Sequence, residues 1–168
     1  MKKKRVVSQA GLLAVSALFL WASPSTVHAE GWDNSGGEWR YLDNANNAVS
    51  EAWRKSGDAW YYLGDDGNMV KDSIVTVGDG IYYLDADGVM AANRWVLAKD
   101  IDDNDAWYYF GADGKAYKGR DGRVYTHEIN GKRYLFNEEG VMKTGFFDAE
   151  GNAVEDDNPF KSAKYYFG

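Results

Sequence analysis

The sequence predicts an all-β protein, a β-solenoid of stacked β-hairpin repeats. Three observations predict it: an aromatic phrase recurs along the chain, a turn follows each copy, and no helical period of 3.6 residues occurs between residues 30 and 168. Tyr and Trp favour pleated, half-buried backbone, and acidic residues followed by glycine favour a turn with positive φ. Each repeat is therefore expected to form a β-hairpin closed by that turn.

The phrase itself fixes the repeat length. Aligned on the glycine of the turn, four copies end at residues 67, 88, 114 and 140, with spacings of 21, 26 and 26. An earlier copy has Asn46 in place of the glycine, and Asn tolerates the left-handed backbone better than most residues. Residues 164–168, KYYFG, start one more copy. We predict about five hairpins over residues 30–168, with a truncated sixth at 164–168.

The fourth unit is longer than those before it. Trp53 precedes the phrase that starts at Trp60 by seven residues, whereas Trp95 precedes Trp107 by twelve. We expect the five extra residues to lie in a loop between stacked hairpins, where an insertion leaves the strand register unchanged.

Side chains in the phrase WYYL alternate between the two faces of its strand. Trp60 and Tyr62 share one face, and Tyr61 and Leu63 share the other. A lone two-stranded hairpin is marginally stable in water, so the units must stack to bury apolar surface. One face is expected to enter the interior and the other to line a groove between successive hairpins.

Residues 1–29 have the features of a signal peptide. Four basic residues at positions 2–5 precede an apolar run at residues 11–22, and residues 27–29 read VHA, which ends in a small residue. The apolar run of twelve is shorter than the about 20 residues that span a bilayer. We expect export of a mature chain, residues 30–168, that has no transmembrane segment.

The expected mature chain is acidic and contains no cysteine. Without residues 1–29 it has 15 basic and 26 acidic residues, a net charge of −11. Such a chain repels phosphate backbones and shows no clustered run of Lys and Arg, so nucleic acid is not an expected partner. The lack of cysteine excludes disulfides, thiol catalysis and Cys-based metal sites.

The sequence predicts neither a catalytic site nor a metal site. His127 is the only histidine of residues 30–168, and no serine lies in a nucleophile-elbow context. Asp100, Asp102 and Asn104 follow the rhythm of a calcium loop, but Asp105 stands where glycine is required and the closing glutamate is absent. Such acidic turns are more often solvated. We expect a protein that is not an enzyme and holds no metal or cofactor.

The repeats resemble the cell-wall or choline-binding repeats of Gram-positive surface proteins. That family's motif is a Gly-Trp pair, a few polar residues, the phrase WYYL, a turn with glycine and a methionine, and residues 31–42 and 52–69 follow it. Residues 131–147 also resemble glucan-binding repeats and the C-terminal repeats of clostridial toxins. The resemblance covers nearly all of residues 30–168 and implies ligand binding in aromatic cages between adjoining hairpins.

The resemblance assigns these cages to the leading Trp of the phrase, the Trp of the Gly-Trp pair and a Tyr of a neighbouring unit. Carried over residue by residue, one set is Trp39, Trp53, Trp60 and Tyr62, a second is Trp95, Trp107 and Tyr109, and Tyr83 lies in the gap between them. Ile74, Ile81 and Arg133 stand at Trp positions, which leaves the number of sites open. Ring faces attract a quaternary ammonium group, which cannot donate a hydrogen bond.

The resemblance thus implies a secreted, non-catalytic protein of the cell wall or cell surface. Its expected partners are cell-wall polymers, either choline-substituted teichoic acid or glycans. The alternatives are a carbohydrate (glucan)-binding solenoid, a solenoid that binds a protein partner, and the targeting part of a larger cell-wall hydrolase or toxin. An unfinished last hairpin would expose strand edges, so a homodimer through the C-terminal hairpin is a further hypothesis.

Overall fold

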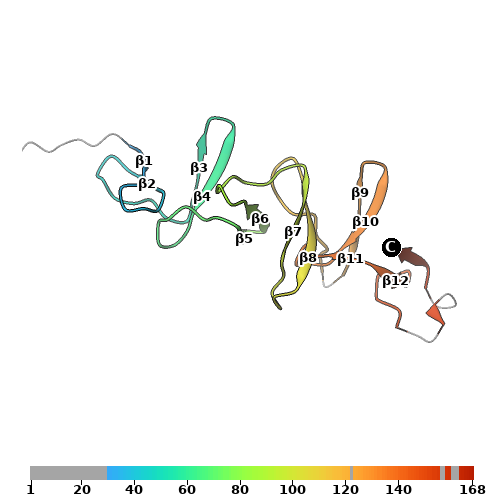
Figure 1. Cartoon of the computed structure of the whole chain (residues 1–168). Coiled ribbons are helices and arrows are strands. Elements are labelled where there is room, and N and C mark those ends of the chain that lie inside the picture. The colour runs from blue at the N-terminus through green and yellow to red at the C-terminus, as the bar shows by residue number, and fades with distance from the viewer. Residues whose placement is uncertain (1–29, 122, 156–157, 160–162) are drawn as a thin grey trace, which may run out of the picture.

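The computed structural model describes residues 30–168 except 122, 156–157 and 160–162, so the expected signal peptide at 1–29 lies outside the described residues. The described residues form strands β1 to β13, which pair as small antiparallel sheets (Figure 1). The prediction of an all-β fold is confirmed. In the described part of the chain, no helix is both long enough and apolar enough to cross a membrane.

Strands that follow each other in the sequence form the hairpins. The pairs are β1 (Gly31–Asp33) with β2 (Arg40–Leu42), β3 (Ala52–Ser56) with β4 (Ala59–Leu63), β5 (Ser73–Val77) with β6 (Gly80–Leu84), β7 (Arg94–Lys99) with β8 (Asp105–Phe110), β9 (Tyr125–Ile129) with β10 (Lys132–Phe136), and β12 (Gly145–Phe147) with β13 (Tyr165–Phe167). The short strand β11 (Met142–Lys143) adds to the free edge of β10.

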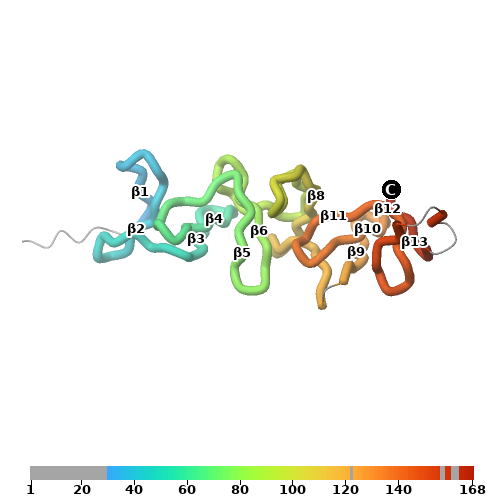
Figure 2. Tube along the Cα trace, turned by 90° about the horizontal axis from the view of Figure 1, so that it is seen from below, coloured from blue at the N-terminus to red at the C-terminus, as the bar shows by residue number. Residues whose placement is uncertain are grey.

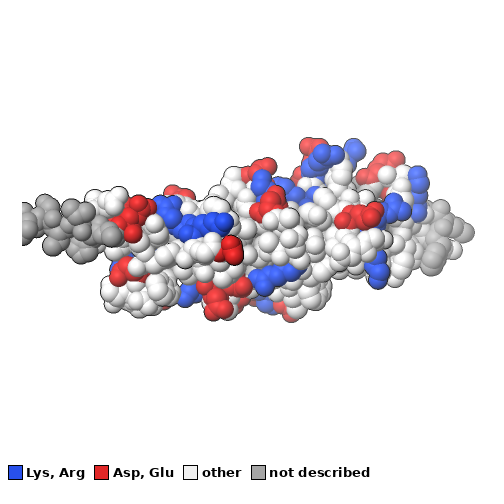
Figure 3. Space-filling model, turned by 90° about the horizontal axis from the view of Figure 1, so that it is seen from above, with Lys and Arg blue, Asp and Glu red and all other residues white. Residues whose placement is uncertain are grey.

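The hairpins succeed one another in chain order along an elongated molecule (Figure 2). The β3–β4 and β9–β10 hairpins, three repeats apart, project to the same side of the long axis (Figure 1). On the face drawn in Figure 3, acidic and basic side chains are interspersed along the length of the molecule.

In the first five repeats the hairpin lies upstream of its acidic turn, which corrects the prediction that the acidic turn closes it. β4 pairs along its whole length with β3, through a turn formed by Gly57 and Asp58. Across the acidic turn there is only one bridge, from Leu63 to Met69. Gly57 has a φ of 59°, the left-handed backbone that a two-residue hairpin turn requires.

The acidic turn instead connects a hairpin to the one before it. The Met69 N–H donates to the carbonyl of Trp39 at 2.7 Å, and the Met90 N–H donates to that of Trp60 at 2.8 Å. The Met69 side chain also packs under the next turn, where a Cβ on Gly88 would lie 2.5 Å from its sulfur. Neighbouring repeats are therefore joined by backbone hydrogen bonds and by close packing of methionine on glycine.

The extra residues of the fourth unit lengthen a hairpin, so the prediction of a loop between hairpins is wrong. β7 and β8 pair from Arg94 and Phe110 to Lys99 and Asp105, and residues 100–104 form the turn. A longer hairpin keeps its added backbone groups hydrogen-bonded, which a loop would leave to water. The expected register is kept, because Trp95 pairs with Tyr109 as Trp53 pairs with Tyr62.

The last residue of the phrase supplies the buried interior. Leu63, Leu84, Phe110 and Phe136 occupy this position in successive repeats, and each is 0% exposed. Leu63 thus enters the interior, whereas Tyr61 on the same face lies 5.3 Å from Trp32 of the preceding hairpin, so neither face enters the interior as a whole. At the C-terminal end, the residues that we expected to start a further copy pair with β12, with Phe147 opposite Tyr165.

Candidate ligand-binding site

Alternation along each strand lets one hairpin contribute aromatic rings in two directions. Tyr62 pairs with Trp53 on one face of the β3–β4 hairpin, and the Trp53 ring lies 4.9 Å from Tyr82 of the following hairpin. Tyr61, on the other face, lies 5.3 Å from Trp32 of the preceding hairpin. Aromatic groups therefore collect in the spaces between successive hairpins, which we number as intervals from the N-terminus.

The first interval, between the β1–β2 and β3–β4 hairpins, has two tryptophans around a hollow. The Trp32 ring lies 6.4 Å from the Trp39 ring and 5.3 Å from the Tyr41 ring. Trp32 and Tyr41 both belong to the first hairpin. The hollow has a volume of about 360 Å³ and is lined by Trp32, Trp39, Tyr61 and Met69, among others. Trp39 is 38% exposed, so part of its ring is accessible to solvent.

The second interval, between the β3–β4 and β5–β6 hairpins, repeats this arrangement. Trp53 lies 5.0 Å from Tyr62 and 4.9 Å from Tyr82, and Trp60 stands two residues before Tyr62 on the same face. The Trp60 side chain is 41% exposed, and the Trp60 carbonyl accepts a hydrogen bond from the Met90 N–H. This interval therefore has the same types of residue at the same positions as the first.

The fourth interval, between the β7–β8 and β9–β10 hairpins, is the third copy of the arrangement. Trp95 lies 6.5 Å from Trp107, 5.2 Å from Tyr109 and 4.8 Å from Tyr134 of the following hairpin. Its ring also stacks on Phe136 at 6.0 Å, while Trp107 is 45% exposed. One tryptophan is thus packed among rings and the other is open to solvent.

In the third interval, between the β5–β6 and β7–β8 hairpins, the two tryptophan positions are filled by residues that pack on the core. Ile74 and Ile81 stand at the Trp positions and pack against a cluster that includes Tyr108. Tyr108 is only 3% exposed, whereas Tyr61 and Tyr82, its counterparts, are half-buried. A hollow of about 870 Å³ beside it is lined by acidic groups as well as by these residues. This interval lacks the exposed tryptophan of the first, second and fourth intervals.

The fifth interval, between the β9–β10 and β12–β13 hairpins, has no tryptophan. Thr126, Arg133 and Leu135 occupy the three positions that Trp and Tyr occupy in the first hairpins, and Tyr165 comes from the following hairpin. It borders a hollow of about 1000 Å³.

The structure divides one predicted residue set and keeps the other. Trp95, Trp107 and Tyr109 lie together as expected. Trp39 lies in the first interval with Trp32, apart from Trp53, Trp60 and Tyr62 in the second, because a hairpin directs one face to each neighbour. Tyr83 lies in the third interval, where its hydroxyl donates to Asp72 at 2.6 Å.

Sequence reasoning missed the residues that complete each interval. These are Trp32, Tyr61, Tyr82, Tyr134 and Met69. The seven-residue spacing before Trp39 marks Trp32. The strand alternation marks Tyr61, but by itself it does not tell which neighbouring hairpin that ring meets.

Two of the predicted site tyrosines, Tyr62 and Tyr83, have a raised pKa. Burial raises the pKa of Tyr62, and the nearby carboxylates of Glu51 and Asp65 raise it further. The hydrogen bond to Asp72, with burial and the charge of Asp72, raises the pKa of Tyr83 to about 12. Both raised pKa values favour the neutral phenol.

In the acidic turns, Asp carboxylates accept hydrogen bonds from backbone N–H groups of the same turn. Asp66 accepts the N–H of Asn68 at 2.9 Å, which with the Asn68 side chain lowers the pKa of Asp66. Asp100 likewise accepts the N–H groups of Asp102 and Asn104, at 3.0 and 2.9 Å. Among the residues that the structure describes, no group of His, Cys, Asp and Glu is arranged to hold a metal ion.

Family models match the β3–β4 and β5–β6 hairpins and parts of the two hairpins that follow them. Residues 49–95 match the model described as "Choline-binding repeat", and residues 101–116 and 127–142 match the one described as "Putative cell wall binding repeat". The chain carries repeats of the choline-binding family. The third interval lies partly within the first match, so a repeat can match while its tryptophans are replaced.

Solved structures contain similar choline-binding repeats. Choline binding protein F from Streptococcus pneumoniae is 30% identical, with a TM-score of 0.53, over 73% of this chain and 38% of that one. CbpJ from Streptococcus pneumoniae is 30% identical, with a TM-score of 0.55, over 76% of this chain and 41% of that one. The chain thus spans about two fifths of the length of each.

A truncated alternansucrase from Leuconostoc mesenteroides shares the fold at 23% identity and a TM-score of 0.51, over 68% of this chain and 10% of that one. A comparison with curated proteins finds no match.

Proposed function

We propose that this chain is a secreted, non-catalytic module that attaches to bacterial cell-wall polymers by holding choline groups between the hairpins of a β-solenoid. The observation that carries the proposal is the first interval, where Trp32, Trp39, Tyr61 and Met69 line one hollow. The matching family models support it, as does a structure of choline binding protein F determined in the presence of a peptidoglycan analogue. The solenoid is supported by the β3–β4 and β9–β10 hairpins, which are three repeats apart and project to the same side of the long axis (Figure 1).

The chemistry of choline fits these walls. A quaternary ammonium group offers no N–H, so its recognition depends on ring faces, at about 0.5 to 2 kcal/mol for each good contact. Trp32 and Trp39 are nearly perpendicular, with 82° between their planes, so they present ring surface on two sides of the hollow. The net charge of −11 over residues 30–168 adds a long-range attraction for a cation.

The intervals differ in their capacity for choline. The first, second and fourth each have two tryptophans from one hairpin and a tyrosine from the next. The third has Ile74 and Ile81 at its Trp positions, where they pack on the cluster around Tyr108, and the fifth has Arg133, a cation, at a Trp position. We therefore assign three choline sites to the described residues.

The proposed function includes no catalytic step. His127 stacks on Tyr117 at 4.5 Å, and its Nε2 lies 3.2 Å from the Lys118 carbonyl. A histidine held by a ring and a backbone carbonyl serves packing, and it has no nucleophile beside it in these contacts.

The test is competition on purified cell walls that bear choline. The full chain should bind the walls, and free choline should release it, while a glucan should not. The double variant Trp53→Ala with Trp60→Ala should bind less and retain its cooperative thermal transition. Failure of choline to release the protein would overturn the proposal, release by glucan would favour carbohydrate binding, and collapse of the double variant would assign those rings to the core.

A further inference from the structure

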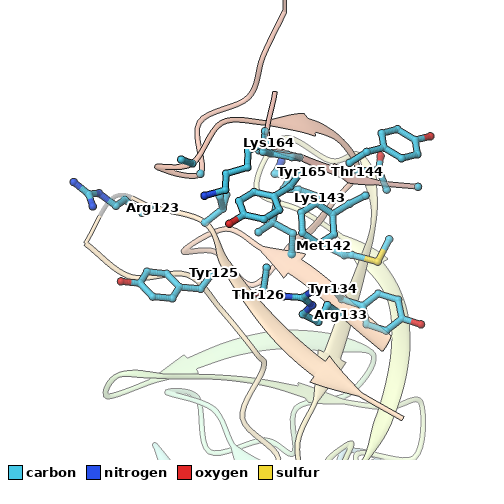
Figure 4. Close-up of a pocket in the computed structure, with 18 of the residues that line it drawn as sticks. Arg123, Tyr125, Thr126, Arg133, Tyr134, Met142, Lys143, Thr144, Lys164 and Tyr165 are labelled. Atoms are coloured by element: carbon cyan, nitrogen blue, oxygen red, sulfur yellow. The ribbon is translucent and has the colours of Figure 1, made fainter. Parts of the chain in front are cut away.

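The hollow at the fifth interval is lined by basic side chains in an otherwise acidic protein. The basic residues that line it are Arg123, Lys132, Arg133, Lys143 and Lys164, and the acidic residue that lines it is Glu150. Figure 4 shows Thr126 and Arg133 on one side of this hollow, with Lys143, Lys164 and Tyr165 on the other. Charges that lie far apart in the sequence are thus gathered at one place.

The strand register puts the central cations on one face. Leu135 pairs with both Thr126 of β9 and Lys143 of β11, so these three side chains form a row across the sheet. Arg133 stands two residues before Leu135 on the same strand and therefore shares that face. Lys164 comes from the next hairpin, where its N–H donates to the Phe147 carbonyl at 2.8 Å.

These cations have no ion-pair partner among the described residues. Elsewhere in the described residues, basic side chains do form ion pairs: Arg40 with Asp33, Arg94 with Asp85 and Lys115 with Asp79. Glu128 stands opposite Arg133 in the ladder, yet the two form no ion pair within the described part of the chain. Arg133 and Lys164 are exposed, and Lys143 is half-buried, so their charged groups can meet a ligand from solvent.

We propose that the fifth interval is a binding site for an oxyanion, a phosphate or a carboxylate group. Arginine offers a planar fork of N–H donors that matches such oxygens, and the lysines add point charges around it. The replacement of tryptophan by Arg133 thus changes the charge of the bound group from positive to negative. That the anion belongs to the same wall polymer rests on the proposed function, whereas anion binding itself does not.

The test is an NMR titration of the full chain with inorganic phosphate and, separately, with acetate, at constant ionic strength set by sodium chloride. The amide signals of Thr126, Leu135 and Lys143 should shift and saturate with at least one of the two anions. Arg133→Gln should weaken this binding about tenfold or more, because it removes a charge-assisted contact. Lys143→Gln is a second variant with the same expected direction.

The matched control is Lys99→Gln, which removes one positive charge from a lysine paired with Asp105 and away from this hollow. It should leave the anion titration unchanged. Tighter binding of phosphate than of acetate would point to a phosphodiester polymer, and the reverse would point to a carboxylate; both support the site. The proposal is overturned if neither anion gives a saturating shift, if Arg133→Gln binds as the parent does, or if choline shifts these same signals.

The two proposals fail independently. Choline binding is followed by tryptophan fluorescence, and all the tryptophans of the described residues lie in the first, second and fourth intervals. If choline gave no fluorescence response while phosphate still gave its NMR titration, the choline proposal would be rejected and the anion site would stand.

Discussion

One tyrosine position of the repeat has two roles, which depend on its neighbours. Tyr61 is half-buried and packs edge-to-face on Trp32 beside a hollow, whereas Tyr108 is 3% exposed among Ala91, Ala116 and Val141. Tyr108→Ala should lower the free energy of unfolding by about 3 to 5 kcal/mol, the usual cost of removing a buried aromatic ring. Urea unfolding measures it.

Tyr61→Ala is the matched variant for that change. It should cost clearly less stability, because its ring is partly solvated, and it should weaken choline binding at the first interval. Equal losses of stability in the two variants would mean that the first interval is also core.

The hydrogen bond of Tyr83 predicts a loss of stability at alkaline pH. Its pKa is raised from 10 to about 12 in the folded protein, first by the Asp72 hydrogen bond and then by burial. Folding therefore favours the protonated phenol, so this contribution is complete below pH 10 and is lost as the pH rises through about 12. Unfolding in urea across this range should show a steeper decline for the parent than for Tyr83→Phe, and parallel declines would contradict the assignment.

At the scale of the element, the contact between one repeat's methionine and the next repeat's glycine should be sensitive to a single methyl group. Gly88 has a φ of 80°, and a Cβ there would lie 2.5 Å from the Met69 sulfur. Gly88→Ala should cost about 2 to 4 kcal/mol, from left-handed strain together with overpacking. Thermal or urea unfolding provides the value.

Gly57→Ala is the control for strain alone. Gly57 has a φ of 59°, and a Cβ there would meet no atom within 4 Å. This variant should cost about 1 to 2 kcal/mol. If Gly57→Ala costs as much as Gly88→Ala, the contact with Met69 contributes nothing.

The strands and their period could be predicted from the sequence, but the partners could not. The phrase around Trp60 marks β4 correctly, since its aromatic residues and alternation are local properties. The acidic turn after it is the more conspicuous turn signal, yet the Met69 N–H beyond it binds the carbonyl of Trp39 in another repeat. Such a choice between partners depends on stacking, which no local pattern contains.

The candidate sites show the same limit. Trp95, Trp107 and Tyr109 belong to one hairpin, and the repeat alone groups them. The cations of the fifth interval come from the segment before β9, from β10, from β11 and from the residue before β13, so the sequence showed no basic cluster. Only the folded chain brings Lys143 and Lys164 to the same hollow as Arg133.

For the whole molecule, the three proposed choline sites on one chain would favour attachment to a polymer over binding of single groups. Once one choline group of a polymer is bound, the others are held at a high effective concentration, so weak sites combine into firm attachment. A variant that lacks one site should therefore bind free choline with two thirds of the parent's capacity but should bind walls disproportionately less.

The three sites also predict how choline stabilises the fold. A ligand that binds only the folded chain adds about 1.4 kcal/mol for each site at ten times its dissociation constant. Trp39→Ala, Trp60→Ala and Trp107→Ala each alter the exposed tryptophan of a different interval. Each should remove about one third of the choline-induced gain in stability, and the losses should add in the triple variant because the intervals share none of these three residues. Calorimetric unfolding with and without choline measures the gain, and Ile81→Val, in the third interval, should leave it unchanged. If any single Trp variant abolished the whole gain, the sites would not be independent and the count of three would be wrong.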